Sequence, residues 1–449
     1  MNKKKTYTIQ TLGCKVNQYE SESIACQLQA NGFEPAFSDA LFAIINTCTV
    51  TQKAGMQSRQ LIRQTIRKNQ NAIIFVTGCH AQICPEDIQT IDGIHYIVGN
   101  AFKHNIVEQI IQLLKEKTIP NKIPVIQMSD ILKHKQYDHI PLTHMPYRTR
   151  PTIKIQDGCN AFCSYCIVPF ARGPSRSLSE KIILEQIKYL QEKQYKEIVL
   201  SGIHLGHYGQ DFKPPISLTD LLNKIMAIPN SPRIRLSSIE PQEVTEELIN
   251  LIYSHKSMCH HLHISLQSGD DVVLQIMNRH YNRSFFKDLI CRIHRQIPDI
   301  AIGIDILVGT PGETQRAFEN TVSLLEQLPA AYFHVFPFSL RKGTQAEHFK
   351  EMVPIQTIKE RAKIIRLLGD QKKLEFFSKN IGLKQTVLIE TISKNGYYGH
   401  TGNYIPVRIP NSFLKQSGQI IHVVLKKVLG LKGMEAVLEN TKDTIRFYQ

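Results

Sequence analysis

The stretch IQDGCNAFCSYCIVPFARG, residues 155–173, decides the fold, because it sets three cysteines close together directly after a strand-like apolar run. Cys159, Cys163 and Cys166 follow a C-x3-C-x2-C spacing. Such a set can bind three corners of one iron–sulfur cluster, whose usual form has four cysteine ligands. One iron is then left for a ligand from outside the protein. The alternatives are three unrelated core thiols or structural zinc, which needs a fourth ligand nearby.

The composition indicates a large soluble protein with a polyanionic partner. The chain has 449 residues, of which 42% are hydrophobic, and its formal net charge is +15. No apolar run approaches the roughly 18 residues of a membrane span, and no apolar segment follows the basic start MNKKK. Ten dispersed cysteines favour reduced thiols and a cytoplasmic location. The positive charge favours nucleic acid as the partner.

Around the cysteine loop, strand-like and helix-like segments alternate. Residues 152–379 contain six such repeats, which predict a full or partial (βα)6 barrel with its chemistry at the carboxyl ends of the strands. Residues 1–117 show the same alternation, with helices expected at 20–30, 54–68 and 102–117, and predict a parallel α/β domain. Between them, residues 118–151 carry five prolines and are interpreted as a linker.

The carboxy-terminal part, residues 380–449, has a different pattern. Short β segments alternate with Gly and Asn turns, and nine Lys or Arg residues stand against four acids. A small basic β-barrel is therefore predicted. The alternative is a dimerising or lid domain whose basic residues are simply solvated.

Three further cysteines each end a strand of the amino-terminal domain. Cys14 follows the first strand, Cys48 the second and Cys79 the third. The carboxyl ends of parallel strands meet at one edge of a sheet, where ligand sites form. The three thiols are therefore expected to converge. The alternative is that each is a small buried hydrophobic residue, as free cysteine often is.

The central loop resembles that of the radical S-adenosylmethionine (radical SAM) enzymes, including the aromatic Tyr165 before the last cysteine. The resemblance implies a 4Fe–4S cluster on Cys159, Cys163 and Cys166. Its open iron would chelate the amino and carboxyl groups of S-adenosylmethionine (SAM), and reduction would cleave SAM to a 5′-deoxyadenosyl radical.

Short motifs at the ends of the later strands are those expected if a SAM molecule lies across the mouth of the barrel. LSGIHLG contains Gly202, where the backbone can approach a ligand closely. RIRLSSIEP offers Ser237 and Glu240 for ribose hydroxyls, and SLQSG offers Gln267. With Tyr165, these four are the expected SAM-binding residues. GIDILVGTPGE resembles the strand that lines the adenine in this family.

Over essentially its whole length the chain resembles the methylthiotransferases. In that family the three amino-terminal cysteines hold a second 4Fe–4S cluster, and the tail is an RNA-binding TRAM domain. LGCKVNQYES, GIHLGHYG and RIRLSSIEP most resemble the branch that methylthiolates C2 of N6-threonylcarbamoyladenosine at position 37 of tRNA. A second SAM would donate the methyl group. Other branches act on isopentenyladenosine in tRNA or on a ribosomal-protein aspartate. RKGTQA, and Asp270 in QSGDD, depart from the family pattern.

The resemblance also implies partners, namely the tRNA anticodon loop and an electron donor such as a flavodoxin-type protein. Basic tail residues would contact phosphates, and tyrosines would either stack on unpaired bases or fill the β core. These residues are Arg408, Lys426, Lys427 and Lys432 for phosphates, and Tyr397, Tyr398 and Tyr404 for bases. No catalytic side chain is assigned beyond the cluster ligands. A non-enzymatic iron–sulfur RNA-binding protein is the alternative from another class.

Overall fold

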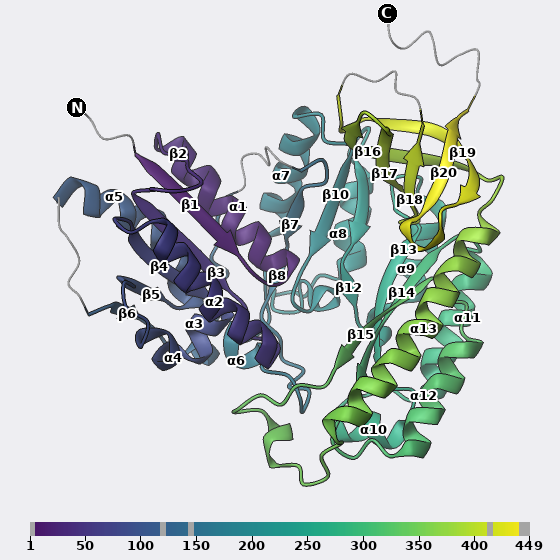
Figure 1. The fold of residues 1–449 in the computed structure, drawn as a ribbon. Helices are drawn as coiled ribbons and strands as arrows, with labels where there is room; N and C mark the ends of the chain where they lie inside the picture. Colours follow the sequence, from purple (N-terminus) through teal and green to yellow (C-terminus); the bar gives the residue numbers. More distant parts are fainter. Residues whose placement is uncertain (1–4, 117–122, 142–147, 411–415, 440–449) are drawn as a thin grey trace, which may run out of the picture.

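A computed structural model describes residues 5–116, 123–141, 148–410 and 416–439. An α/β unit at the amino terminus lies beside a central layer of parallel strands, and a small β-barrel lies at the far end of the long helix α13 (Figure 1). The α/β class and its three parts are as predicted. Residues 118–122 and 142–147 of the predicted linker lie outside the described residues, as do 411–415 and 440–449 of the predicted tail domain.

The amino-terminal sheet has the order β2-β1-β3-β4-β5-β6, and every neighbouring pair is parallel. All six residues of β3 are buried, as expected for a central strand covered on both faces. The strands are β1 (Thr6–Thr11), β2 (Glu34–Pro35), β3 (Phe42–Thr47), β4 (Ile73–Gly78), β5 (Tyr96–Val98) and β6 (Val125–Gln127).

Helices cover both faces of this sheet. Ile24 of α1 and Ile110 of α5 pack on the face that presents Ile44, whereas Ile62 of α2 packs on the face that presents Ile45. The helices are α1 (Lys15–Ala30), α2 (Gln52–Lys68), α3 (Cys79–Ile83), α4 (Pro85–Gln89), η1 (Asn100–Asn105), α5 (Ile106–Glu116) and η2 (Ile131–Lys133). Helix α1 begins at Lys15, whereas the sequence predicted a start at residue 20. Its N-cap residue is Cys14, which makes no side-chain capping hydrogen bond, so the sequence carries no capping signal for the true start.

The central strands form two neighbouring parallel sheets, β11-β10-β7 and β12-β13-β14-β15. One residue, Ser237, separates β11 from β12, so the two sheets continue one another as a partial barrel. The strands are β7 (Thr152–Lys154), β10 (Glu197–Ser201), β11 (Arg233–Leu236), β12 (Ser238–Ile239), β13 (His261–Gln267), β14 (Ala301–Val308) and β15 (Tyr332–Pro337), with a short antiparallel pair β8 (Gln156–Asp157) and β9 (Arg176–Ser177).

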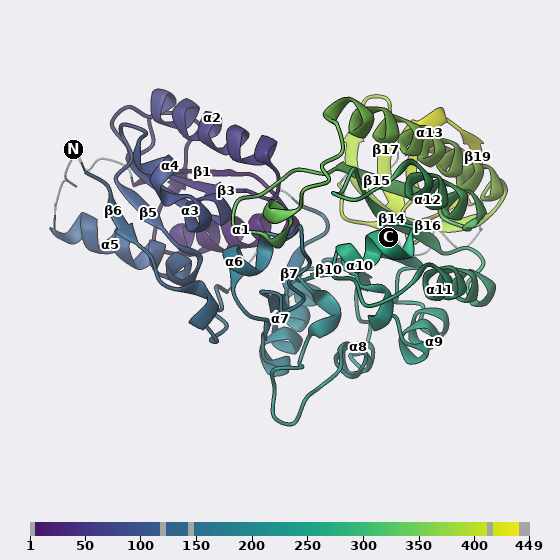
Figure 2. The same ribbon diagram turned by 90° about the horizontal axis from the view of Figure 1, so that it is seen from below.

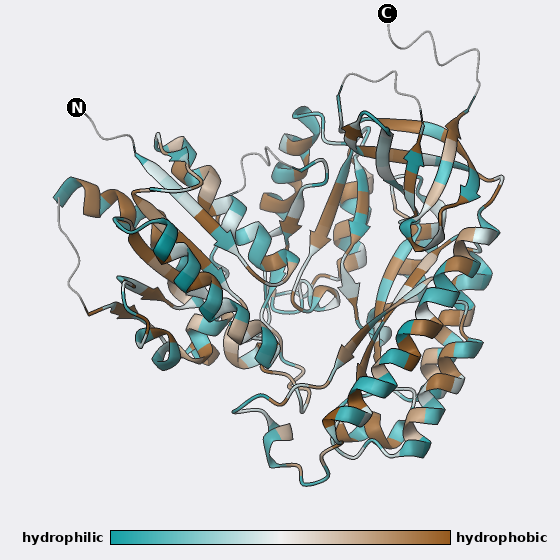
Figure 3. Cartoon of the chain, in the orientation of Figure 1, coloured by the Kyte–Doolittle hydropathy of each residue, from teal (hydrophilic) through white to brown (hydrophobic). Residues whose placement is uncertain are grey.

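Helices follow the strands of the partial barrel and bury one large apolar core against them. Their surfaces alternate between apolar and polar residues, as expected for helices with one face on a sheet (Figure 3). They are α6 (Val168–Arg172), α7 (Glu180–Glu192), η3 (Leu205–His207), α8 (Leu218–Met226), η4 (Pro241–Glu243), α9 (Glu246–Ser254), α10 (Asp271–Ile276), α11 (Arg283–Gln296), α12 (Gln315–Gln327), η5 (Gln345–His348) and α13 (Ile355–Lys379). None of the helices in the described residues is long and apolar enough to span a membrane.

The tail closes into a barrel of order β16-β17-β18-β20-β19. Tyr397 lies in its core with Val387 and Val423, so this tyrosine fills the interior and is not available for base stacking. Tyr398, by contrast, is exposed. The strands are β16 (Lys384–Ser393), β17 (Gly396–Thr401), β18 (Pro406–Ile409), β19 (Ile420–Val428) and β20 (Met434–Leu438), with η6 (Gly430–Lys432) before the last.

Candidate cluster sites and the ionic network between them

The central cysteines lie in a loop between β8 and α6 that backbone hydrogen bonds hold in place. The Cys159 N–H donates to Gly173 O at 3.0 Å, and the Cys166 N–H donates to Cys163 O at 2.9 Å. Gly158 has φ +73°, and a Cβ there would lie 1.9 Å from Pro174 O. Only glycine therefore fits at the position before the first cysteine.

Polar groups surround the central thiols. Ala161 N–H donates to Cys159 Sγ at 3.4 Å, and His204 Nδ1 lies 3.4 Å from the same sulfur. Arg279 Nη1 donates to Cys163 Sγ at 3.4 Å. Hydrogen-bond donors and a guanidinium aimed at sulfur are what a thiolate-bound group requires. Burial, and then the neighbouring Cys163, raise the pKa of Cys166 to about 12, so a bound metal must supply the charge that keeps this thiolate ionised.

The amino-terminal cysteines follow three neighbouring strands and come together at one edge of the sheet. A Cβ built on Gly13 would lie 3.1 Å from Cys48 Sγ, so the turn before Cys14 packs on the second cysteine. Burial, and then the charges of Cys79 and Cys14, raise the pKa of Cys48 to about 11. Cys14 is open to solvent, yet the protein around it raises the pKa of its thiol, and Arg172 opposes this. The three thiols thus act on one another electrostatically, as ligands of one group would.

Asn17 fixes the turn that carries Cys14. Its Nδ2 donates to Leu12 O at 2.8 Å and to Thr47 O at 3.0 Å, which ties the start of α1 to the ends of β1 and β3. The Cys48 N–H donates to Ser58 Oγ at 3.1 Å, and this hydroxyl donates back to Cys48 O at 2.8 Å. Side chains of α1 and α2 therefore hold two of the three cysteine turns.

The residues expected to bind SAM lie around the central loop in different environments. Ser237 is buried, and its hydroxyl has no hydrogen-bond partner among the described residues, as expected of a group reserved for a ligand. Glu240 instead pairs with Arg279. A Cβ on Gly202 would lie 2.9 Å from Gln156 Oε1, so this glycine permits close packing within the protein. Gln267 ends β13 with φ 65°, and Tyr165 packs on the apolar cluster that includes Val273.

Arg279 and His204 are two site residues that sequence reasoning missed. Arg279 contacts Cys163, Glu240 and the Tyr281 hydroxyl, the last at 3.1 Å. Burial alone would lower the pKa of His204, but its neighbours Cys159 and Glu243 raise it to about 10. Arg279 lies in the segment MNRHY, which matches no known motif. His204 lies inside GIHLG, in which only the glycines indicate a ligand-binding turn.

A buried ionic network joins the two cysteine sites where α1 lies beside β7 (Figures 1 and 2). Arg172 ends α6, six residues after Cys166, and its Nη1 lies 2.5 Å from Glu20 Oε1 on α1. Its Nη2 donates to Asn17 Oδ1. Four cations share two carboxylates here; the members are Lys103, Lys154, Arg172 and Arg176 with Glu20 and Asp157.

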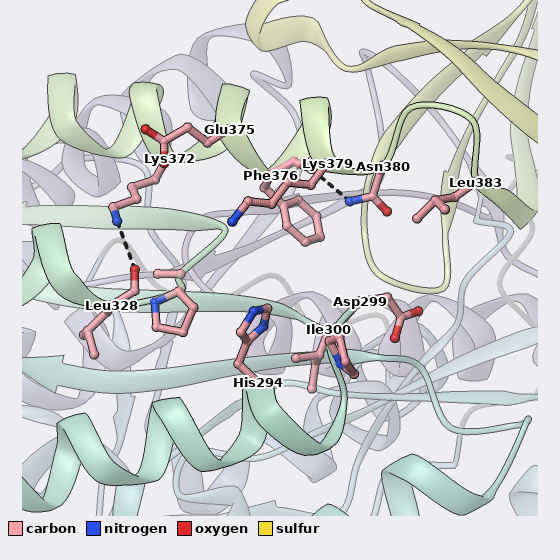
Figure 4. Close-up of a pocket in the computed structure, with 13 residues that line it drawn as sticks. His294, Asp299, Ile300, Leu328, Lys372, Glu375, Phe376, Lys379, Asn380 and Leu383 are labelled. Atoms are coloured by element: carbon pink, nitrogen blue, oxygen red, sulfur yellow. Dashed lines mark hydrogen bonds between the residues drawn. The ribbon is translucent and has the colours of Figure 1, made fainter.

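A separate pocket lies between α11 and α13, away from all six cysteines (Figure 4). Lys372 Nζ donates to Leu328 O at 3.0 Å across it, and Asn380 Nδ2 donates to Phe376 O at 2.8 Å. No cysteine lines this pocket. Its walls are made of aliphatic side-chain segments and of polar groups, most of which hydrogen-bond to other groups of the protein. It adds nothing to the chemistry of the thiol sites.

Comparison with known proteins agrees with this geometry. Residues 153–325 match the Radical SAM superfamily, and residues 6–99 match the family described as uncharacterized protein family UPF0004. A radical SAM methyltransferase from Kitasatospora setae, TsrM, has a similar fold, with a TM-score of 0.55, 16% identity and coverage of 77% of each chain. The fold and the three-cysteine loop define a radical SAM protein, a class that carries a 4Fe–4S cluster and uses SAM.

Whole-chain relatives narrow the class. The chain is 36% identical to the threonylcarbamoyladenosine tRNA methylthiotransferase MtaB of Bacillus subtilis, over 90% of both chains. It is 34% identical to that of Aquifex aeolicus, over 93% of this chain and 99% of the other. It is 32% identical to the tRNA-2-methylthio-N(6)-dimethylallyladenosine synthase of Clostridium botulinum, over 87% of both. The chain belongs to the methylthiotransferase family of radical SAM enzymes.

Proposed function

We propose that this enzyme methylthiolates C2 of N6-threonylcarbamoyladenosine at position 37 of tRNA. The observation that carries the proposal is the pair of three-thiol sites, at Cys159, Cys163 and Cys166 and at Cys14, Cys48 and Cys79, in a chain 34–36% identical to relatives named for this reaction. We assign a 4Fe–4S cluster to each site. A second SAM is the proposed methyl donor, and a flavodoxin-type protein the proposed electron donor.

The chemistry of the substrate explains why such cofactors are needed. The C2–H bond of adenine is neither acidic nor easily displaced, so acid–base groups have little to act on. When bound, the central cluster supplies the electron that cleaves SAM to a carbon radical, and the amino-terminal cluster supplies or holds sulfur. The chain positions these groups. The buried contacts of Arg172 fix α1 and the central loop relative to each other. Arg279 donates to Cys163 Sγ, and His204 Nδ1 lies 3.4 Å from Cys159 Sγ.

The proposed SAM contacts are Gly202, Ser237, Glu240, Gln267 and Tyr165. Ser237, with its unpartnered buried hydroxyl, is the best supported of these. Glu240 would act through Arg279, which it holds beside Cys163, rather than by binding ribose alone. Glu240 pairs with Arg279 because an ionised carboxylate at this buried position is costly without a neighbouring cation.

Contacts to tRNA are assigned to the small β-barrel. Lys426, Lys427 and Lys432 are exposed and form no ion pair among the described residues, so their charges are free for phosphates. Arg408 lies 3.9 Å from Glu435 and is partly neutralised. Of the tyrosines, Tyr398 is exposed, whereas Tyr404 packs against Arg235 and His261.

The deciding experiment is mass spectrometry of tRNA nucleosides from a strain that lacks the gene. Loss of methylthio-threonylcarbamoyladenosine, restored by the wild-type gene and not by Cys163→Ala, is the expected result. An unchanged level in a strain without a second such enzyme refutes the assignment. Loss of the methylthio-dimethylallyl nucleoside instead selects the other tRNA reaction, and loss of a modified ribosomal-protein aspartate selects the protein substrate. SAM cleavage under reducing conditions that survives Cys163→Ala refutes the proposed mechanism, in which the central cluster cleaves SAM.

A further inference from the structure

A row of three aromatic side chains lies on one face of β15, the edge strand of the second central sheet. Tyr332, His334 and Phe336 alternate along this strand, so their side chains share a face. The ring centroids of Tyr332 and His334 are 5.3 Å apart, and those of His334 and Phe336 are 6.4 Å apart. These three residues, the aromatic row, therefore form a continuous series of rings along the strand.

The aromatic row lies on the inner face of the partial barrel. Phe333 and Val335, which alternate with it, pack on the apolar core beneath the helices. The row therefore points the opposite way. His334 Nδ1 lies 3.5 Å from Asp305 Oδ1 on β14, and the ring centroid of His334 lies 4.5 Å from that of His263 on β13.

The inner face is polar, so hydrophobic packing does not account for the row. The interior of a closed barrel of this kind is usually filled with bulky branched side chains. Here the inward positions of β13 are His261, His263 and Ser265, whereas Leu262 and Ile264 point outward into the apolar core. An aromatic ring beside these polar groups buries little apolar surface against them.

The carboxyl end of the row is open to solvent. Phe336 is 47% exposed, and the side chain of His334 is 55% exposed. A single exposed apolar residue is ordinary on a protein surface. Phe336 differs because it continues a row of neighbouring rings that leads into a pocket. Exposed rings of this kind are available to a flat ligand.

The pocket lies at the amino end of the row, between β15, α13 and the tail barrel, and has a volume of about 340 Å³. The first two rings of the row line it, together with Tyr404 of the tail barrel and Arg366, Asp370 and Lys373 of α13. Arg366 Nη2 donates to Val335 O at 3.4 Å, which holds this guanidinium beside the row. Neither cation forms an ion pair with another described residue. Two cations against one carboxylate leave the lining net positive.

The other end of the row leads toward the central cysteine loop. Phe336 pairs in register with Leu307 of β14, and Leu307 belongs to the apolar cluster on which Tyr165 packs. Ser237, a proposed SAM contact, lies directly before β12. Three strand spacings, about 14 Å, separate β12 from β15. Since the target adenine must reach SAM, the row suits a base beside the target rather than the target itself.

We propose that Phe336, at the exposed end of the aromatic row, stacks on an unpaired base directly beside the target adenine in the anticodon loop, and that Arg366 contacts the backbone phosphate there. The inference rests on the proposed function, which supplies the tRNA partner. A ligand that matches exposed rings and unpaired cations combines aromatic planes with negative charge, as a nucleotide does. Stacking platforms flanked by cations are the usual means by which proteins hold single strands.

The test is a mutant cycle between Phe336 and single bases of the RNA. Four anticodon stem–loops carry threonylcarbamoyladenosine at position 37 and are otherwise intact, abasic directly before it, abasic directly after it, or abasic at position 37 itself. Binding to the anaerobically reconstituted enzyme is measured by fluorescence anisotropy without reductant, so no turnover is involved. Iron content and circular dichroism of each variant show that the protein is loaded and folded.

Phe336→Ala is expected to weaken binding of the intact RNA about 5- to 150-fold, and Phe336→Trp to bind as the wild type does, because it keeps a stacking surface. The effect of Phe336→Ala should disappear for one of the two RNAs that lack a flanking base, since the partner of the ring is already absent. Phe285→Ala is the matched control, because Phe285 is a 39% exposed phenylalanine on α11.

Three outcomes overturn the stacking proposal. Phe336→Ala has no effect on any RNA, or it weakens all four equally, or its effect disappears only when the target base is removed. For the phosphate contact, Arg366→Gln should lower the slope of log Kd against log salt concentration by about one. An unchanged slope overturns that contact.

Failure of the proposed function is a separate result. Wild-type protein that binds no stem–loop overturns both proposals. Wild-type protein that methylthiolates only a dimethylallyladenosine RNA refutes the proposed function, and the same cycle with that RNA then decides whether Phe336 stacks on a flanking base.

Discussion

Replacing Glu20 by glutamine is expected to destabilise this protein more than removing the arginine that it contacts most closely. Glu20 is buried and lies 2.5 Å from Lys103 Nζ, 3.0 Å from Lys154 Nζ and 2.5 Å from Arg172 Nη1. Burial alone would raise its pKa, but Arg172, Lys103 and Lys154 hold the pKa of Glu20 well below the usual value. The carboxylate is thus ionised and serves three buried cations at once.

The magnitudes follow from how many charges each substitution leaves without a partner. Within the part of the chain that the structure describes, Glu20→Gln leaves Lys103 without an ion-pair partner and Arg172 with only Asp157 at 3.4 Å. Breaking a buried pair in this way costs about 3–5 kcal/mol. After Arg172→Met, Glu20 keeps both lysines and the side-chain volume is nearly retained, so the loss is mainly of charge-assisted hydrogen bonds, about 2 kcal/mol.

The assay is urea denaturation of the cluster-free protein, followed by far-ultraviolet circular dichroism. Glu22→Gln is the control, because Glu22 also lies on α1 and pairs with Arg148 at 2.6 Å, but that pair is partly exposed and is worth at most about 1 kcal/mol. The expected order of destabilisation is Glu20→Gln, then Arg172→Met, then Glu22→Gln. If Arg172→Met proves the most destabilising, or if Glu20→Gln matches the control, the charge count is wrong.

Three further predictions concern the sites. Cys163→Ala should lose about four irons and all reductive SAM cleavage, whereas Cys14→Ala should lose about four irons and still form 5′-deoxyadenosine. Iron analysis and chromatography of the products measure this difference. If the two variants cleave SAM equally, the assignment of the two sites is wrong. Arg279→Met should cost about 3–5 kcal/mol in urea denaturation by stranding Glu240, and adding Glu240→Gln should restore part of the loss; a double variant with no recovery would show that charge is not the cause. Asp305→Asn should cost about 2 kcal/mol near pH 7. Burial alone would raise the pKa of Asp305, but its histidine partners lower it to about 2. The stabilisation that Asp305 provides should therefore fade between about pH 4 and pH 2. A difference in unfolding free energy between wild type and Asp305→Asn that stays constant over this range would refute the prediction.

The placement of three cysteines at neighbouring strand ends was predictable from strand periodicity. Cys14, Cys48 and Cys79 follow apolar strand-like runs, and parallel connectivity then brings the ends of those strands to one edge. The central trio is local in the chain, so its spacing alone makes a shared ligand possible. The α/β class and the closed tail barrel are confirmed for the same reason, since hydrophobic period and turn residues are local signals.

The tail tyrosines show where local pattern stops being informative. Tyr397, Tyr398 and Tyr404 lie in similar short β segments, yet the first is buried in the barrel core, the second is exposed, and the third packs on Arg235. The two neighbours Tyr397 and Tyr398 differ because alternate residues of a strand face opposite sides. Which side is the interior depends on how the barrel closes, and the segment itself does not contain that information.

By itself, the sequence predicted the two sets of three cysteines, the α/β class with its closed tail barrel, and the family. Only the tertiary structure decided which charges meet: Arg172 with Glu20, 152 positions apart, and Arg279 with Cys163, 116 apart. The physical reason is range. Thiol spacing and hydrophobic period act over a few residues, whereas the pairing of buried charges is a property of the whole packed molecule, since every buried ion must find its partner wherever the fold delivers one.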